Sequence, residues 1–206
     1  MKGAGSKIYF IFDMNTPGTV FIKLVDWMRP HVDHKRVGKA IIDHIAETKE
    51  PLTRFTCRFL PVDILCKAGK IEDFKTFAEP ELLKIFTPND PLVRPIPWCM
   101  EFKKRNNDKI KKHEYFDYLK ATINNNVHPV QYEDSHYEVV IEIFRDMLVL
   151  AILPKYKTLK KYNLQSLCGE NDKGDDSDGD EAAPKKVVKL SDLIKQKAEA
   201  DKLGGK

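Results

Sequence analysis

Two short apolar runs near the end of the foldable region most constrain what this chain can fold into. Residues 137–144 and 147–153 are rich in Val and Ile, and only Arg145-Asp146 separates them. β-branched residues favour a pleated surface, and a link this short suits a hairpin. The sequence therefore predicts two paired strands that are buried within a larger sheet.

The rest of the chain alternates between strand-like and helix-like patterns. Short runs bounded by Pro, Gly or charged residues predict further strands, and apolar residues at three- and four-residue spacing predict helices. The expected strands are 8–12, 20–25, 54–60 and 97–107, and the expected helices are 34–47, 64–86 and 113–124. Helix 64–86 is expected in two pieces, with Gly69 loosening the middle and Pro80 opening the second piece. The proline-rich stretch 87–97 is expected to be a loop.

Three of these elements carry a pattern that predicts which face is buried. In helix 34–47 the buried stripe is expected to be Val37, Ala40, Ile41, His44 and Ile45, and in helix 113–124 it is Phe116, Leu119 and Ile123. In strand 54–60 the alternation predicts a buried face formed by Phe55, Cys57 and Phe59, with Arg54 and Arg58 on the exposed face.

This order of elements predicts an α+β or α/β fold in which helices pack on one face of a mixed sheet. The chain has 206 residues and 42% apolar content, enough for one domain, or for one domain plus a small partner. It contains no apolar run near the length of a membrane span. Its amino end lacks the pattern of a secretory signal, so we expect no membrane association.

Charge is distributed unevenly along the chain. Residues 170–181 carry seven acids and one lysine, and residues 182–206 carry seven lysines and three acids. Because the whole chain has a net charge of +4, residues 1–169 carry +6. The foldable region is therefore the basic region, and residues 169–206 are expected to be a disordered, charged tail.

We find no residue pattern that supports catalysis, a cofactor or a metal. The nucleotide-binding, nucleophile-elbow and zinc-protease motifs are all missing from the sequence. Glu142 is a lone carboxylate within a strand, and His31 and His34 have no cysteine pair nearby. Cys57 and Cys99 lie in apolar runs, which predicts buried, reduced thiols and a reducing compartment. We therefore expect a protein that is not an enzyme and binds no cofactor.

Basic residues gather in three places, and the first two clusters directly follow predicted strands that should be neighbours in the sheet. Cations next to aromatic or amide groups at the rim of a sheet suit a polyanion with exposed bases, which indicates RNA. A solvated face is the simpler alternative. The first cluster is Lys103, Lys104, Arg105, Asn106, Asn107, Lys109, Lys111 and Lys112; the second is Lys155, Lys157, Lys160 and Lys161 with Tyr156 and Tyr162; the third is Arg54, Arg58, Lys67 and Lys70.

Four segments in the same order carry a resemblance to a known family. They are CRFLPVDILCKA (57–68), FKKRNN (102–107), YEVVIEI (137–143) and LKKYNLQSL (159–167). They resemble THUMP-domain proteins, the small RNA-binding modules of tRNA-modifying enzymes. Within that family they are most similar to the stand-alone type that serves as tRNA adaptor for the RNA cytidine acetyltransferase. The resemblance covers roughly residues 18–168, with a weaker match at 9–15.

The resemblance implies a fold and a function. The fold would be a ferredoxin-like part at 7–60, here reduced by a helix, packed on a THUMP domain at 61–168. The function would be to present serine and leucine tRNAs for N4-acetylcytidine formation, with acetyl-CoA and ATP bound by the partner enzyme. Residues that the resemblance implies touch RNA are Lys67, Lys103, Arg105, Asn106, Asn107, Lys160 and Tyr162. Lys104, Lys155, Lys157 and Lys161 join them as members of the same basic clusters.

Two other functions remain open from the sequence. The chain could be the THUMP-type subunit of another RNA-modifying enzyme, such as a methyltransferase, or a structural RNA-binding protein of ribosome assembly. The expected location is the nucleus or nucleolus and the cytoplasm. The shortened first part would expose apolar sheet surface, unless a partner covers it or the sequence is incomplete.

Overall fold

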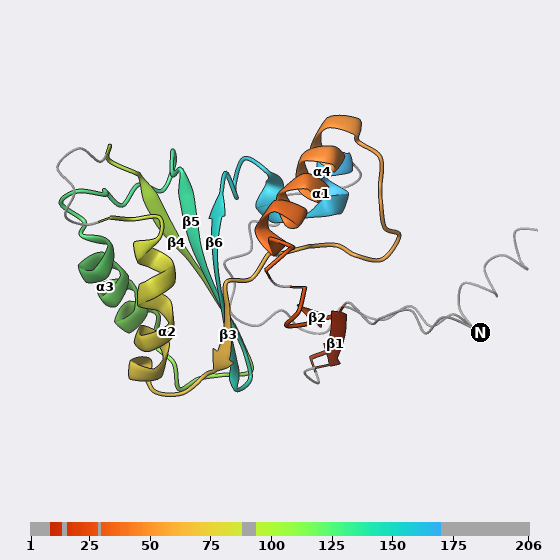
Figure 1. Ribbon diagram of the computed structural model, residues 1–206. Coiled ribbons are helices and arrows are strands. Elements are labelled where there is room, and N and C mark those ends of the chain that lie inside the picture. Colours follow the sequence, from red (N-terminus) through yellow and green to blue (C-terminus); the bar gives the residue numbers. More distant parts are fainter. Residues whose placement is uncertain (1–8, 14–15, 29, 88–93, 170–206) are drawn as a thin grey trace, which may run out of the picture. The chain divides into compact units, whose positions relative to one another are not determined.

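The computed structural model describes residues 9–13, 16–28, 30–87 and 94–169 (Figure 1). All of these described residues belong to one compact unit. The predicted tail, from residue 170 on, and residues 88–93 of the predicted proline-rich loop lie outside the described residues. The elements are β1 (Tyr9–Asp13), β2 (Val20–Leu24), α1 (His34–Thr48), β3 (Ile64–Lys67), α2 (Ile71–Leu83), β4 (Trp98–Arg105), α3 (Lys112–Ile123), β5 (Tyr137–Phe144), β6 (Met147–Pro154), the short helix η1 (Lys160–Tyr162) and α4 (Leu164–Cys168).

A four-stranded mixed sheet forms the centre of the fold. Its strand order is β3-β6-β5-β4, in which β4 runs parallel to β5 and the other neighbours are antiparallel. The prediction of an α+β fold with helices on a mixed sheet is confirmed. Because the parallel pair needs a crossover, α3 and the segment after it connect β4 to β5.

The predicted hairpin is present and lies in the middle of this sheet. Residues of β5 and β6 pair from Tyr137 with Pro154 to Phe144 with Met147, and Arg145-Asp146 forms the turn. Both strands have neighbours on each side, so nearly every side chain from 138 to 153 outside the turn is buried. This explains why the two runs are apolar at successive positions rather than alternating.

Helices α2 and α3 cover one face of the sheet (Figure 1). Their apolar side chains pack with alternate residues of the strands, and Phe74 lies against Tyr115 at the helix–helix contact, with ring centroids 4.9 Å apart. The strand residues in this core include Trp98, Met100, Val139, Ile141, Ile143, Leu148, Leu150 and Ile152. We call this side the helix face of the sheet.

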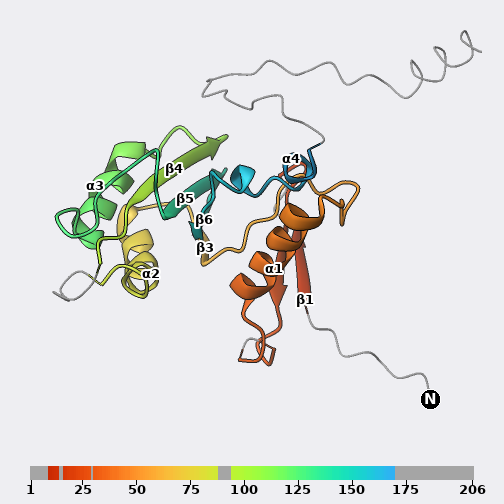
Figure 2. The same ribbon diagram turned by 90° about the horizontal axis from the view of Figure 1, so that it is seen from above.

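Part of the opposite face is covered by α1, α4 and the segment between β6 and α4. Ile42 and Ile45 of α1 share a core with Val140, Ala151 and Leu153 of the sheet and with Tyr156 and Tyr162. Seen from above in Figure 2, α1 and α4 lie next to each other, on the other side of the sheet from α2 and α3. We call this side the second face. The sequence predicted helices on one face only, whereas the structure has helices on both.

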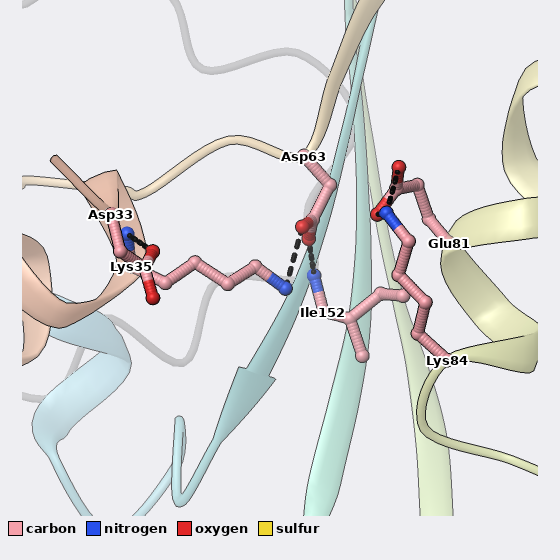
Figure 3. A network of polar contacts seen from close by, with 6 residues as sticks. All are labelled: Asp33, Lys35, Asp63, Glu81, Lys84 and Ile152. Atoms are coloured by element: carbon pink, nitrogen blue, oxygen red, sulfur yellow. Dashed lines mark hydrogen bonds and ion pairs between the residues drawn. The ribbon is translucent and has the colours of Figure 1, made fainter. Parts of the chain in front are cut away.

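A polar network attaches the start of α1 to the sheet (Figure 3). Asp33 caps the helix by accepting a hydrogen bond from the Lys35 backbone N–H at 2.8 Å, and the Lys35 ammonium lies 2.5 Å from an Asp63 oxygen. The other Asp63 oxygen accepts from the Ile152 backbone N–H at 2.8 Å. Asp63 is nearly fully buried, so both of its oxygens have partners, as buried carboxylates require.

The predicted face of helix α1 is wrong in part. Ile45 is buried and Ile41 partly buried, as predicted. Val37 is 45% exposed, and Ala40 and His44 are also exposed, whereas Gly38 and Ile42 are buried instead. The buried stripe is therefore rotated by one residue from the predicted one. In α3 the prediction holds for Leu119 and Ile123, but Tyr115 replaces Phe116 as the fully buried aromatic residue.

Two predicted elements between residues 54 and 86 are also wrong. Residues 54–60 form no strand; they contribute an isolated bridge between Arg58 and Asn163, and Phe55 and Cys57 are exposed. Residues 64–67, predicted to be helical, form the edge strand β3, and α2 is a single helix that contains Pro80. Pairing with β6 stabilises this short run as a strand, and its local pattern does not reveal that partner.

The strands predicted at 8–12 and 20–25 are present as β1 and β2, and they form a separate antiparallel hairpin. Tyr9 pairs with Leu24 at one end and Asp13 with Val20 at the other. The aromatic ring of Phe21 meets that of Phe144 edge to face, with centroids 6.2 Å apart. Several apolar side chains of this hairpin are exposed, among them Ile11, Val20 and Ile22. The ferredoxin-like assignment of 7–60 and the boundary at residue 61 stay predictions.

Candidate nucleic-acid interface

Basic residues from two strands, β3 and β4, and from the turn between β5 and β6 lie along one edge of the sheet. The register aligns Arg105 of β4 with Phe144 of β5, which pairs with Met147 of β6, which in turn pairs with Lys67 of β3. The Arg145 backbone N–H donates to the Arg105 carbonyl at 2.9 Å, so the two arginines are adjacent. We call this the turn edge. Lys67, Arg105 and Arg145 are all exposed on it.

The two asparagines of the first cluster have different surroundings. Asn106 is exposed and has a φ of 55°, a left-handed conformation that asparagine tolerates well. Asn107 donates from its amide to the Arg145 carbonyl at 2.6 Å, and its side-chain oxygen accepts from the backbone N–H groups of Lys109 and Ile110. Asn107 therefore braces the turn edge with all of these contacts, and Asn106 is the asparagine whose side chain lies on the surface.

The lysine cluster after β6 begins at the opposite edge of the sheet. We expected the first two clusters to follow neighbouring strands, but β5 separates β4 from β6, and β6 runs antiparallel to β4. The second cluster therefore begins at Lys155, close to Trp98 at the start of β4, whereas Arg105 lies at the turn edge at the end of β4. Eight residues of strand separate the two ends, a span of roughly 25 Å.

The chain then folds back over the second face in a tight left-handed turn. Lys160, Lys161 and Tyr162 have φ values of 52°, 54° and 58°, and Lys155 has a φ of 53°. A residue other than glycine in this left-handed conformation costs about 1–2 kcal/mol relative to the right-handed one. The Tyr156 backbone N–H donates to the buried Glu138 carboxylate at 3.0 Å, which fixes the start of the turn.

Tyr162 is 2% exposed, so its ring lies in the core rather than on the surface. Its hydroxyl donates to the Pro154 carbonyl at 3.0 Å, and burial raises the pKa of the phenol to about 12. Tyr162 therefore supports the turn formed by residues 155–162, which we call the lysine turn.

The fold-back brings the two clusters onto one surface. The Lys161 ammonium lies 3.6 Å from a Glu101 oxygen, in the middle of β4. Since Met100 and Phe102 pack on the helix face, the alternation of the strand puts Glu101, Lys103 and Arg105 on the second face. A row of cations therefore runs from Lys161 past Lys103 to Arg105 and Arg145. We call these four residues the basic strip.

The other predicted site residues lie around this strip. Lys104 is exposed, and the strand alternation puts it on the helix face. Lys155 and Lys160 are exposed at the lysine turn. The Lys157 ammonium donates to the Tyr132 carbonyl and lies 5.5 Å from the centroid of the Tyr132 ring.

Beside the strip, a partly buried ion pair connects the loop after α1 to the sheet. The Arg58 guanidinium bonds to the Glu142 carboxylate, whose side chain is 8% exposed. Burial lowers the pKa of Arg58, but the attraction and hydrogen bond to Glu142, together with attraction to Tyr156 and Glu101, outweigh burial, so the pKa is raised above its ordinary value. Arg58 was expected on an exposed strand face. It is instead a structural cation that neutralises a carboxylate beneath the basic surface.

Sequence reasoning missed Arg145 as a site residue. Its position gave the signal, because the two-residue link of a buried hairpin must emerge at a sheet edge, where a cation is exposed. The Arg105 guanidinium, 5.8 Å from the Phe144 ring centroid, is oriented by that ring. The arrangement on this face can hold a string of phosphates, because its cations are fixed to a rigid sheet.

Within the described part of the chain, no group of three or more His, Cys, Asp or Glu side chains is placed to hold a metal ion. Over the same residues, no helix has the length and apolar character needed to cross a membrane. Cys99 is buried as predicted, and burial raises the pKa of its thiol, whereas Cys57 is exposed.

The fold and the strip together define a basic α+β protein with a cationic sheet surface. No protein-family model matches the chain. Along 170 residues, 82% of its length, it is 29% identical to the THUMP domain-containing protein 1 homolog of Drosophila melanogaster, and it spans about half (49%) of that relative.

Two solved structures are also similar to this chain. The solution structure of the THUMP domain of THUMP domain-containing protein 1 is 27% identical, covers 42% of this chain and 89% of that one, and superposes with a TM-score of 0.35. The crystal structure of PH1313 from Pyrococcus horikoshii Ot3 is 13% identical, covers 70% of this chain and 42% of that one, and has a TM-score of 0.42. The sequence similarity to the fly protein extends over most of the chain, including all four segments that carry the THUMP resemblance.

Proposed function

We propose that this chain is a THUMP-type RNA-binding adaptor without catalytic activity, which presents tRNA to an RNA cytidine acetyltransferase for N4-acetylcytidine formation. The basic strip is the observation that carries the RNA-binding part. Similarity to a THUMP domain-containing protein supports it. The adaptor role, the serine and leucine tRNAs and the partner enzyme rest on the sequence resemblance.

The strip suits a phosphate backbone for a physical reason. Strand residues two apart are about 6–7 Å apart, so Lys103, Arg105 and the Lys161 ammonium beside Glu101 form a regularly spaced row. Arginine can grip a phosphate with two parallel hydrogen bonds, and a lysine ammonium acts as a point charge. Lys67 and Asn106 extend this surface along the turn edge, and Lys155 and Lys160 extend it at the lysine turn.

Transfer chemistry belongs to the partner under this proposal. The acetyl donor and ATP would bind the acetyltransferase, and this chain would supply affinity and orientation for tRNA. We also propose that the protein is located in the nucleus or nucleolus and the cytoplasm.

Binding of tRNA by charge-neutralised variants tests the RNA-binding part. The variant Lys103→Gln/Arg105→Gln/Arg145→Gln should bind tRNA at least tenfold more weakly than the parent protein, because it removes phosphate contacts. The matched control is Lys75→Gln/Lys84→Gln/Lys120→Gln, which removes the same charge from α2, from the residue that follows α2, and from α3. Equal weakening of both variants would show that net charge alone drives binding and would contradict the proposal.

Cells that lack the protein test the adaptor part. Nucleoside mass spectrometry of their tRNA should show loss of N4-acetylcytidine, and affinity purification from normal cells should recover the acetyltransferase. Loss of a methylated nucleoside would instead favour the methyltransferase alternative. Crosslinked RNA dominated by ribosomal precursors, with normal tRNA acetylation, would favour a role in ribosome assembly.

A further inference from the structure

We infer that the loop after α1 forms a subsite for an unpaired RNA base, in which Phe55 stacks on the base and Arg54 and Gln165 line the adjacent pocket. This inference rests on the RNA-binding function proposed above and deepens it. The subsite lies outside the basic strip, and its residues were not among the predicted site residues, apart from Arg54 as part of a thin third cluster.

The loop is anchored firmly at its carboxyl end. The Leu164 backbone N–H donates to the Cys57 carbonyl at 2.8 Å, and the Phe59 N–H donates to the Tyr162 carbonyl at 3.2 Å. The ion pair between Arg58 and Glu142 attaches the same point to the sheet. These contacts hold the loop next to the lysine turn, because Leu164 and Tyr162 directly follow Lys160 and Lys161.

Phe55 is the most unusual side chain of this loop. It is 85% exposed, although it is a large apolar ring, and the Arg54 guanidinium lies 5.5 Å from its centroid. A shallow pocket of about 240 Å³ opens beside it, lined by Pro51, Leu52, Thr53, Arg54 and Gln165. The pocket is smaller than the roughly 300–1,000 Å³ of sites for whole ligands or cofactors, so it suits a single small ring.

The chemistry of this pocket matches a nucleobase. A flat aromatic ring stacks on a base of any sequence, and a guanidinium can stack on a base or bind its phosphate. The side-chain amide of Gln165 offers both a donor and an acceptor for a base edge. Leu52 and Pro51 supply the apolar wall that a planar ring needs.

The base must be unpaired to reach Phe55. Bases within a duplex are stacked on their neighbours, and a protein contacts such a helix mainly through its phosphates and 2′-hydroxyl groups. The basic strip and the lysine turn suit that backbone, and Phe55 lies beyond the lysine turn. An RNA whose paired part lies on the strip can therefore extend a single-stranded nucleotide to the loop.

Two RNAs that differ in one feature test this inference with the full chain. One is a blunt-ended RNA hairpin, and the other is the same hairpin with a short single-stranded extension at either end. Phe55→Ala should weaken binding of the extended RNA about tenfold, the loss of one stacked base, and leave binding of the blunt hairpin unchanged. Phe55→Tyr should retain the affinity for the extended RNA. The matched control is Phe77→Ala, which removes another exposed phenylalanine from α2 and should change neither affinity.

Fluorescence provides a second readout that a structural role would not change. In Phe55→Trp combined with Trp27→Phe, the extended RNA should quench the new indole, and the blunt hairpin should not. The base subsite is overturned if the extended RNA does not quench the indole, or if Phe55→Ala changes binding of both RNAs equally. A loop that binds a protein instead of RNA would give the first of these results. Failure of the proposed function looks different, because the blunt hairpin would then bind with an affinity that the basic-strip variant does not lower.

Discussion

At the scale of single residues, charged side chains on the second face fall into two kinds. Arg105 and Arg145 are exposed and Lys103 is half-buried at the surface, whereas Arg58 neutralises Glu142 beneath it. The sequence alone does not separate these kinds, because a strand pattern and a loop pattern both predicted exposed arginines. The distinction comes from the partner 84 positions away in the chain, which only the fold reveals.

The Arg58–Glu142 pair gives a prediction for stability. Arg58→Ala should lower the free energy of unfolding by roughly 3 kcal/mol, since it leaves a buried carboxylate without its cation. Urea unfolding measures this. The double variant Arg58→Met/Glu142→Leu should recover most of the loss, because apolar residues of similar size need no partner. An Arg58→Ala variant as stable as the parent protein would show that the pair contributes nothing.

Among the predicted RNA-binding residues, the cations lie on the surface, whereas Tyr162 and Asn107 have structural roles instead. Lys and Arg positions at the ends of strands lie on the surface because a charged group is rarely buried. Tyr162 and Asn107 were predicted at the same surface, but the structure uses Tyr162 in the core and Asn107 as a brace of the turn edge. Tyrosine and asparagine serve either role, so their presence in a motif does not decide it.

At the scale of elements, the long strands with apolar runs were predictable, and the short strand that depends on distant pairing was not. The hairpin of β5 and β6 and the long β4 follow from their apolar runs. β3 has only four residues and pairs with β6, 80 to 86 positions away, so its pattern resembled the start of a helix. The loop at 51–57 had the opposite problem, because alternation predicted a strand for residues that have no strand to pair with.

A buried glycine explains why the observed buried stripe of α1 is rotated by one residue from the predicted stripe. Gly38 is buried, and a Cβ added there would lie 2.5 Å from the Pro61 ring. The helix therefore approaches the chain before β3 through a glycine, which hydropathy patterns do not count as a core residue. Ile42 and Ile45 follow on the same side.

This close contact gives a prediction for the element. Gly38→Ala should destabilise the protein, although alanine is favoured over glycine within a helix by about 1 kcal/mol. The clash with the rigid proline ring should outweigh that gain and lower the melting temperature by several degrees. Thermal unfolding checks this, with Ala40→Gly on the exposed side of the same helix as a measure of helix propensity alone. A higher melting temperature for Gly38→Ala would show that Pro61 moves aside freely.

At the scale of the whole molecule, the sequence predicted the basic surface but not its continuity. The clusters were expected on neighbouring strands, whereas the strand order puts their starting points at opposite edges. What joins them is the left-handed turn after β6, and three consecutive residues with positive φ cannot be anticipated from a run of lysines and tyrosines. The surface therefore depends on backbone geometry as much as on composition.

Salt dependence of tRNA binding is the prediction at this scale. For about six phosphate contacts, affinity should fall on the order of a thousandfold between 50 and 200 mM salt. For the variant Lys103→Gln/Arg105→Gln/Arg145→Gln, the plot of log affinity against log salt concentration should be shallower, by about one for each phosphate contact removed. Filter binding or fluorescence anisotropy over that range measures both slopes. An affinity independent of salt would mean that phosphates contribute little.

The fold-back of the chain after β6 has a consequence for comparing homologues. Lys161 reaches Glu101 because five residues, 156–160, separate it from Lys155, and the tyrosines on either side are anchored in the core. One inserted or deleted residue in that interval would turn the ammonium group away from β4 while leaving the number of lysines unchanged. Homologues that keep the length of this interval should therefore share the binding surface, and spacing is a better guide to it than overall basicity.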